Sequence, residues 1–224
     1  MNKQKIDFRL EAKRQGDNTI VYLYGDIVDE RPRDWWSGEE IEGDFIIPGE
    51  VRKVFDEIDT NDIELHINSY GGSVFASVSI FNHIRALAKN VTVIIDGLAA
   101  SGASLIAMAG SKLIMPKNTT MMIHRASTFC WGNCNNIRKV ADTLEKLDNA
   151  TVFETYKAKF KGTDEELKQL IDSETWLSAD ECLENGLCDE VVELNSKSEK
   201  DEPQMEEINN AIKFLNNFAN LKLK

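Results

Sequence analysis

The chain has 224 residues, 42% of them hydrophobic, and a formal net charge of −12 at pH 7. This length suits one domain with a short appendage, and the acidic balance disfavours nucleic acid or an anionic membrane surface as a partner. No apolar run approaches the ~20 residues that span a bilayer, and the first residues lack the apolar stretch of a secretory signal. We therefore expect a cytoplasmic protein.

Hydrophobic periodicity predicts that strands alternate with helices through most of the chain. Strands are expected at residues 20–24, 63–67, 91–95, 113–115, 121–123 and 191–194. Helices are expected at residues 48–58, 74–87, 99–109 and 137–161, followed by two that start at the capping boxes 163–166 and 178–181. This alternation indicates an α/β fold.

Three stretches interrupt the alternation. Residues 29–44 form a long polar loop, in which Trp35 and Trp36 either cap the core or stand exposed as a binding surface. Residues 195–204 read as a solvated linker. Residues 205–224 carry apolar side chains at helical spacing, and so short an amphipathic helix needs a partner or its own domain to dock on.

The four cysteines are Cys130, Cys134, Cys182 and Cys188. Their single C-x3-C spacing is not repeated and no histidine pair accompanies it, so the pattern does not indicate a zinc site. We expect free, buried thiols, as in a reducing compartment, and neither a metal nor a cofactor.

A serine and a histidine are the first candidates for chemistry. The segment 97–103, Gly-Leu-Ala-Ala-Ser-Gly-Ala, offers Ser101 as a nucleophile, although a serine there can also be a simple N-cap or packing residue. Of the three histidines, His66 falls inside a strand and His83 on a helix. His124 falls at a strand end, where catalytic groups of α/β folds tend to lie, so it is the best placed base.

The segment 68–73, Asn-Ser-Tyr-Gly-Gly-Ser, offers bare backbone N–H groups. Glycine admits a positive φ and lets a substrate carbonyl approach without a Cβ clash, and a helix N-terminus favours negative charge. We expect the N–H groups of Gly71 and Gly102 to form an oxyanion hole. A plain glycine turn is the alternative interpretation of Gly71-Gly72.

An acidic side chain would orient the histidine. Asp172, Glu174 and Asp189 all lie downstream, and Glu174 stands just before the capped helix that starts at Ser178. A solvated Glu174 without a catalytic role is the alternative, so the residues alone leave the acid open.

These segments, in this order and spacing, resemble the Clp protease family, the self-compartmentalising serine peptidases of the Clp/crotonase superfamily. The residues that carry the resemblance are 67–74, 97–103, 122–124, 176–179 and 185–189. The resemblance covers residues 19–194 and implies a spiral of repeated β-β-α units, preceded by an N-terminal segment, 1–18.

By this resemblance, Ser101 is the nucleophile and His124 is the general base. The acidic position of the family falls on Glu174, where aspartate is usual. Because glutamate reaches one methylene further, Asp172 stays an alternative acid.

The resemblance also implies Gly71 and Gly102 as the oxyanion donors. The helix over about 135–160 would be the handle that joins stacked rings, and residues 129–136 would be an adjoining strand that binds peptide or pairs between rings. In this strand the usual glycine pattern is partly replaced. The implied substrate-binding positions are Gly72, Ser73, Cys130, Trp131 and Gly132.

The leading hypothesis is a serine endopeptidase that hydrolyses peptide bonds through an acyl-enzyme and assembles into homo-oligomeric rings. The short segment before Ile20, the 29–44 loop and the 195–224 tail resemble Clp-like proteases of tailed phages. Such proteases act in prohead maturation, with capsid or scaffold protein as partner, in the host cytoplasm. A housekeeping Clp proteolytic subunit that works with an ATP-dependent unfoldase is the alternative. A non-catalytic assembly protein on the same fold is the alternative of another class.

Overall fold

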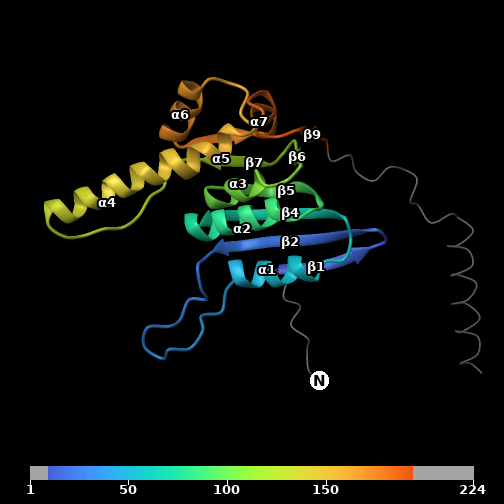
Figure 1. Ribbon diagram of the computed structural model, residues 1–224, viewed down its shortest axis with the longest axis horizontal. Helices are drawn as coiled ribbons and strands as arrows, with labels where there is room; N and C mark the ends of the chain where they lie inside the picture. Colours follow the sequence, from blue (N-terminus) through green and yellow to red (C-terminus); the bar gives the residue numbers. More distant parts are fainter. Residues whose placement is uncertain (1–9, 194–224) are drawn as a thin grey trace, which may run out of the picture. The chain divides into compact units, whose positions relative to one another are not determined.

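The structure is a computed structural model that describes residues 10–193. The predicted linker, 195–204, and the predicted tail helix, 205–224, lie outside the described residues. The strands are β1 (Leu10–Gln15), β2 (Asn18–Ile27), β3 (Phe45–Ile46), β4 (Asp62–Gly72), β5 (Asn90–Ala100), β6 (Lys112–Pro116), β7 (Thr120–Ile123), β8 (Thr175–Ser178) and β9 (Glu190–Val192). The helices are α1 (Pro48–Glu57), α2 (Val74–Ala86), α3 (Gly102–Ala107), α4 (Cys134–Leu147), the π-helical turn η1 (Asp148–Val152), α5 (Phe153–Lys157), α6 (Asp164–Asp172) and α7 (Ala179–Glu184) (Figure 1).

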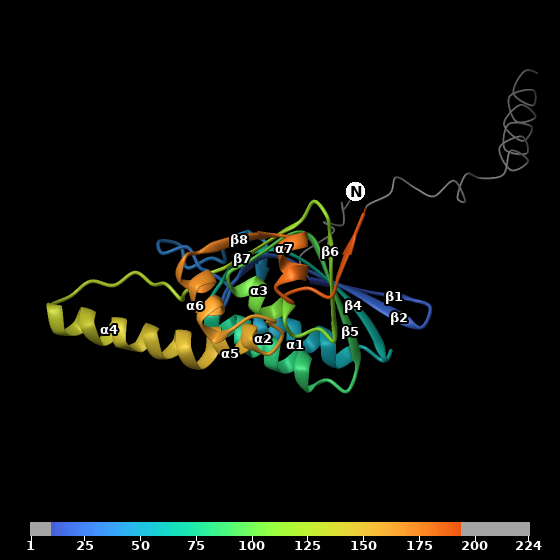
Figure 2. The same ribbon diagram turned by 90° about the horizontal axis from the view of Figure 1, so that it is seen from above.

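One mixed sheet runs through the described residues, with the strand order β1-β2-β4-β5-β6-β9. Strands β2, β4, β5 and β6 are parallel neighbours, whereas β1 pairs antiparallel with β2. Strand β7 pairs with both β5 and β8. Helices α1 and α2 lie along one side of the central strands (Figure 2), and alternate side chains of β2, β4 and β5 are buried. The predicted α/β fold is confirmed.

The boundary between β5 and α3 differs from the prediction. The strand predicted over 91–95 continues to Ala100, so the helix predicted over 99–109 begins only at Gly102. Ala100 lies opposite Met122 of β7, and this pairing holds the extension in place. Alanine favours helix by well under ~1 kcal/mol per residue, which sheet pairing outweighs.

The start of the sheet also differs. Strand β1 lies within the segment 1–18, where no strand was predicted, and pairs with β2 along its whole length. Its sequence, Leu-Glu-Ala-Lys-Arg-Gln, is mostly polar. It therefore lacks the alternation of apolar and polar residues that indicates a half-buried strand.

The polar stretch 29–44 contains a loop, as predicted. The Asp34 carboxylate accepts the N–H groups of Trp36 and Ser37 at 2.9 and 2.7 Å, which orders the tip of the loop. Trp35 and Trp36 are 92% and 89% exposed, so the interpretation that they cap the core is wrong.

Helices α4, η1 and α5 form one continuous helical stretch, residues 134–157, which we call the handle segment. It begins where the Asn133 side chain accepts the N–H groups of Asn135 and Asn136, both at 3.1 Å. It ends before the predicted stop at Gly162. Helix α4 buries none of its side chains and projects away from the sheet (Figures 1 and 2). Within residues 10–193, no helix is long and apolar enough to cross a membrane.

All four cysteines are free. Cys182 and Cys188 are buried, as expected, and burial raises the pKa of both thiols. Cys130 and Cys134 are exposed, contrary to the expectation, because they lie where the chain leaves the core for the handle segment.

A polar cluster occupies the open face of the central strands. His66 of β4 contacts Asp96 of β5 through Nδ1 at 2.7 Å and Glu64 through Nε2 at 2.8 Å. Tyr24 of β2 donates its hydroxyl hydrogen to Asp96, and the Tyr22 ring lies 5.0 Å from the His66 ring. Burial alone would lower the pKa of His66, but the bonds to Asp96 and Glu64 outweigh it, so the pKa is raised.

We expect this cluster to make stability depend on pH. Because the folded-state pKa of His66 is raised, its contribution to stability is fully present below the unfolded value of about 6.5. That contribution is lost as the pH rises through the folded-state pKa. Urea unfolding of wild type and His66→Gln between about pH 5.5 and about pH 8.5 checks this, because only the wild type should show the loss. Parallel pH curves for the two proteins would contradict it.

Candidate active site

Ser101 lies in the sharp turn between β5 and α3. Its φ is +54°, in a region of backbone conformation that residues other than glycine seldom adopt. Its N–H donates to the Met122 carbonyl of β7 at 2.9 Å, which ties the turn to the neighbouring strand. This hydrogen bond therefore holds the partly exposed Ser101 at the end of a central strand.

His124 comes directly after β7, which ends at Ile123. Ala100, the last residue of β5, lies opposite Met122 of β7. The residues that follow the two strands, Ser101 and His124, are therefore close to each other. His124 Nε2 lies 2.7 Å from Ser101 Oγ, a hydrogen bond of ordinary length. The two candidates named from sequence are thus in direct contact.

The structure separates the three candidate acids. Glu174 Oε2 lies 3.7 Å from His124 Nδ1, which is an ion-pair distance longer than a hydrogen bond, and the Glu174 side chain is 62% exposed. Asp172 Oδ1 instead accepts Arg125 Nε at 2.6 Å. Asp189 accepts the N–H of Leu113 at 2.7 Å. Of the three, only Glu174 is placed beside His124.

Strand pairing explains the position of Glu174. Strand β8 runs antiparallel to β7, with Thr175 opposite Ile123. One step further along both strands, Glu174 meets His124. The φ of Glu174 is +49°, so its backbone makes an unusual turn between α6 and β8.

The two adjacent glycines differ in what their N–H groups do. The buried Gly71 donates its N–H to Ser69 Oγ at 3.0 Å, and a Cβ built on Gly71 would lie 2.7 Å from the Gly102 nitrogen. Ser73 donates its N–H to Ile27 of β2 at 2.8 Å. Successive N–H groups of a strand point to opposite edges, so the Gly72 N–H points away from β2, toward β5.

Gly72 and Gly102 stand close together. A Cβ built on Gly102 would lie only 3.4 Å from the Gly72 nitrogen. Gly72 is exposed, and its φ of +145° is one that glycine adopts readily. The backbone nitrogen of Gly72 therefore lies near Gly102, the residue that follows Ser101.

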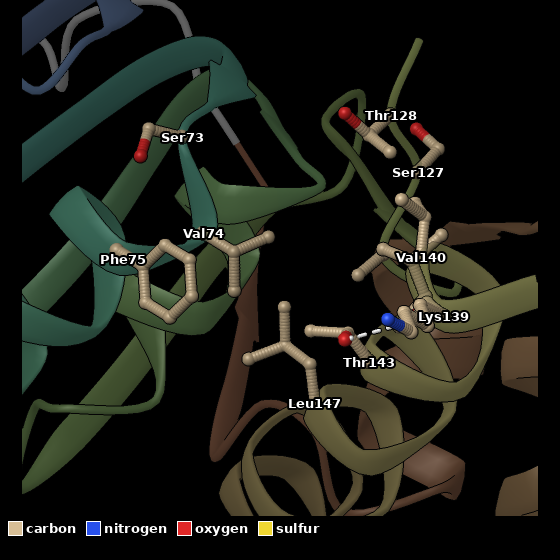
Figure 3. Close-up of a pocket in the computed structure, with 11 residues that line it drawn as sticks. Ser73, Val74, Phe75, Ser127, Thr128, Lys139, Val140, Thr143 and Leu147 are labelled. Atoms are coloured by element: carbon tan, nitrogen blue, oxygen red, sulfur yellow. Dashed lines mark hydrogen bonds between the residues drawn. The ribbon is translucent and has the colours of Figure 1, made fainter. Parts of the chain in front are cut away.

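A pocket of about 450 Å³ is lined by residues that follow the glycines and His124 in the chain, although Ser101 and His124 themselves do not line it. Its lining includes Ser73 and Val74, which follow the two glycines, and Ala126, which follows His124. Figure 3 shows Val74 and Phe75 on one side and Val140 and Leu147 of the handle segment on the other. The sequence did not predict that these apolar residues line a pocket. The helical spacing of those in the handle segment does indicate an apolar helix face that packs against other residues.

The predicted peptide-binding strand over 129–136 is wrong. Residues 124–133 hold no strand, and α4 already begins at Cys134. No described strand pairs with this stretch, and the Asn133 cap starts a helix instead. Of the residues predicted to bind substrate, Ser73 lines the pocket, whereas Cys130, Trp131 and Gly132 do not.

Within residues 10–193, no cluster of three or more histidine, cysteine, aspartate or glutamate side chains could hold a metal ion.

Fold and site together define a mixed α/β protein in which a serine, a histidine and backbone N–H groups meet at the ends of neighbouring strands. Residues 54–195 match the family model described as Clp protease, and the chain belongs to the Clp protease family.

Several relatives are named as ATP-dependent Clp protease proteolytic subunits. The one from Bacteroides fragilis is 33% identical over 135 residues, which are 58% of this chain and 64% of that protein. Subunit 1 of Streptomyces avermitilis is 35% identical over 136 residues, 59% and 61% of the two chains. Subunit 2 of Thermobifida fusca is 30% identical over 166 residues, 72% and 81% of the two chains. The match spans less than two thirds of the first two relatives.

Proposed function

We propose that the protein is a serine endopeptidase that cleaves peptide bonds through an acyl-enzyme on Ser101. The observation that carries the proposal is the 2.7 Å contact between Ser101 Oγ and His124 Nε2. A serine hydroxyl is a weak nucleophile until a base removes its proton, and this contact supplies the base. Membership in the Clp protease family supports the same reaction.

In the first half of the reaction, His124 takes the Ser101 proton as Oγ attacks the scissile carbonyl carbon. His124 then gives this proton to the leaving amine, the C–N bond breaks, and an ester on Ser101 remains. In the second half, a water loses its proton to His124 and attacks the ester. The acid is released as His124 returns the proton to Ser101 Oγ.

Charge that develops on the carbonyl oxygen needs two donors. We assign the Gly102 N–H and one glycine N–H of the 71–72 turn to this role, with Gly71 as the expected donor and Gly72 as the alternative. Both glycines approach Gly102: a Cβ built on Gly71 would lie 2.7 Å from the Gly102 nitrogen, and a Cβ built on Gly102 would lie 3.4 Å from the Gly72 nitrogen. One such donor is typically worth about 3 kcal/mol of transition-state stabilisation.

Glu174 is the proposed acid. Its carboxylate would hold the imidazole tautomer that presents Nε2 to Ser101 and would stabilise the imidazolium. At 3.7 Å and largely exposed, the contact supports a weaker contribution than a buried aspartate makes.

Covalent labelling tests the proposed activity. With diisopropyl fluorophosphonate, intact mass of the wild type should rise by one adduct, and peptide mapping should place it on Ser101. Ser101→Ala should gain nothing, whereas the exposed control Ser111→Ala should label like wild type. A wild type without an adduct, or an adduct that persists in Ser101→Ala, would refute the assignment.

The assembly and the cellular role are finer proposals. We propose a homo-oligomeric ring with the family's β-β-α spiral in each subunit, in which the handle segment contacts other subunits. The unburied side chains of α4 support this contact. The names of the relatives favour a proteolytic subunit that works with an ATP-dependent unfoldase. The 29–44 loop, with its exposed tryptophans, is the feature that favours a phage prohead protease acting on capsid or scaffold protein.

Degradation of a folded protein separates the two roles. A proteolytic subunit of the housekeeping type should degrade a folded, tagged substrate only when a bacterial Clp unfoldase and ATP are added. A prohead protease should cleave unaided, and intact mass should show whether it also cuts its own linker near 195–204. Well-formed rings without labelling or cleavage would favour a non-catalytic assembly protein.

A further inference from the structure

The chain that follows His124 is held by one carboxylate of the handle segment. Strand β7 ends at Ile123, and residues 124–133 contain no helix or strand. Asp148 Oδ1 accepts the Ala126 N–H at 2.7 Å, and Asp148 Oδ2 lies 3.4 Å from Arg125 Nη1. Asp148 thus contacts both residues that come directly after the candidate base.

Asp148 is unusual for its burial. It is the only charged residue among the buried ones of residues 10–193, and its side chain is 9% exposed. A buried carboxylate is costly unless hydrogen bonds and an opposite charge compensate it, and here Ala126 and Arg125 do so. Asp148 also begins the π-helical turn η1, a rare feature that is frequent at functional sites.

Arg125 extends the connection to the candidate acid. Its Nε donates to Asp172 Oδ1 at 2.6 Å, and Asp172 is the last residue of α6. Glu174 follows two residues later, in a backbone turn with a φ of +49°. One arginine therefore joins the segment that carries His124 to the segment that carries Glu174.

We propose that Asp148 is a positioning residue for the His124–Glu174 pair, acting through the Ala126 N–H and the Arg125 side chain. It sets the direction in which the chain leaves β7, and with it the distance of the imidazole from Ser101 and Glu174. The inference rests on the proposed function. It makes the geometry of the base depend on the handle segment at η1.

Variants at Asp148 test the proposal. Asp148→Ala should slow labelling of Ser101 by diisopropyl fluorophosphonate by about 10- to 100-fold, because small misplacements of a catalytic group have effects of this size. Asp148→Asn keeps an oxygen that accepts the Ala126 N–H, so its rate should stay within about threefold of wild type. Asp142→Ala, an exposed carboxylate of α4, is the matched control and should label like wild type.

A second readout does not need activity. The imidazole ring signals of His124, followed by NMR of histidine-labelled protein, should shift in Asp148→Ala because the ring moves relative to Ser101 and Glu174. They should keep their positions in Asp142→Ala. If wild type is not labelled at all, the proposed function fails, and the NMR comparison alone decides the positioning role.

Unchanged labelling and unchanged His124 ring signals in Asp148→Ala would overturn the proposal, as would equal losses in Asp142→Ala. If Asp148→Ala does not fold, Arg125→Gln replaces it, because the Arg125 side chain is 50% exposed. We expect labelling of Arg125→Gln to be about 3- to 10-fold slower, with displaced His124 ring signals. Wild-type values for both measurements in a folded Arg125→Gln protein would overturn the proposal.

Discussion

Replacing His124 with alanine is expected to lower kcat/KM for peptide hydrolysis by about 10⁴-fold. Without the imidazole, which stands 2.7 Å from Ser101 Oγ, the hydroxyl keeps its proton and the leaving amine lacks an acid. The free energy of unfolding should change little, because His124 is partly exposed and its strand ends before it. Hydrolysis of a fluorogenic peptide and urea unfolding measure the two quantities.

Two further variants serve as comparisons for His124→Ala. His83→Gln changes another of the three histidines, on α2, and should keep wild-type hydrolysis. Glu174→Gln should lose only about tenfold, because its carboxylate is largely exposed and 3.7 Å away. A His124→Ala protein that retains a tenth or more of wild-type activity, roughly, would show that His124 is not the base.

The second large effect is expected from Gly72→Ala, on stability. A Cβ at this position would lie 2.0 Å from the Ile27 carbonyl oxygen, and its backbone φ of +145° is strained for alanine. Because the clash is with backbone of the paired strand, β2 and β4 must separate locally. We expect a loss of about 3 kcal/mol or more in the free energy of unfolding, measured with urea.

Gly38→Ala is the matched control. Gly38 also has a positive φ, +70°, but a Cβ there meets nothing within 4 Å. It should therefore show only the conformational cost, about 1 kcal/mol. Equal losses in the two variants would mean that the approach of Ile27 to Gly72 is not what requires glycine.

The order of strands and helices could be predicted from the sequence because apolar periodicity is a local signal. Ser101 and His124 could be named for the same reason: each follows an apolar strand, and the other histidines fall within regular elements. The structure then brings their side chains to 2.7 Å.

The candidate acid, by contrast, depended on tertiary structure. Asp172, Glu174 and Asp189 are all acidic residues downstream of His124, and the sequence leaves the choice among them open. The register of β8 against β7 and the ion pair of Asp172 with Arg125 distinguish them. The exposure of Trp35 and Trp36 likewise depends on what does or does not pack over a loop.

Local sequence also could not assign the glycine donor or the course of residues 129–136. Gly71 donates its N–H to Ser69 and Ser73 donates its N–H to Ile27, and these two acceptors lie on different strands. The expected strand over 129–136 had no neighbour to pair with among the described residues, so the Asn133 helix cap prevailed. The sequence by itself thus determined the order of the main strands and helices and the two candidate side chains, Ser101 and His124, because these follow from local patterns. Only the tertiary structure decided the partners of each hydrogen bond, because those partners are distant in the chain.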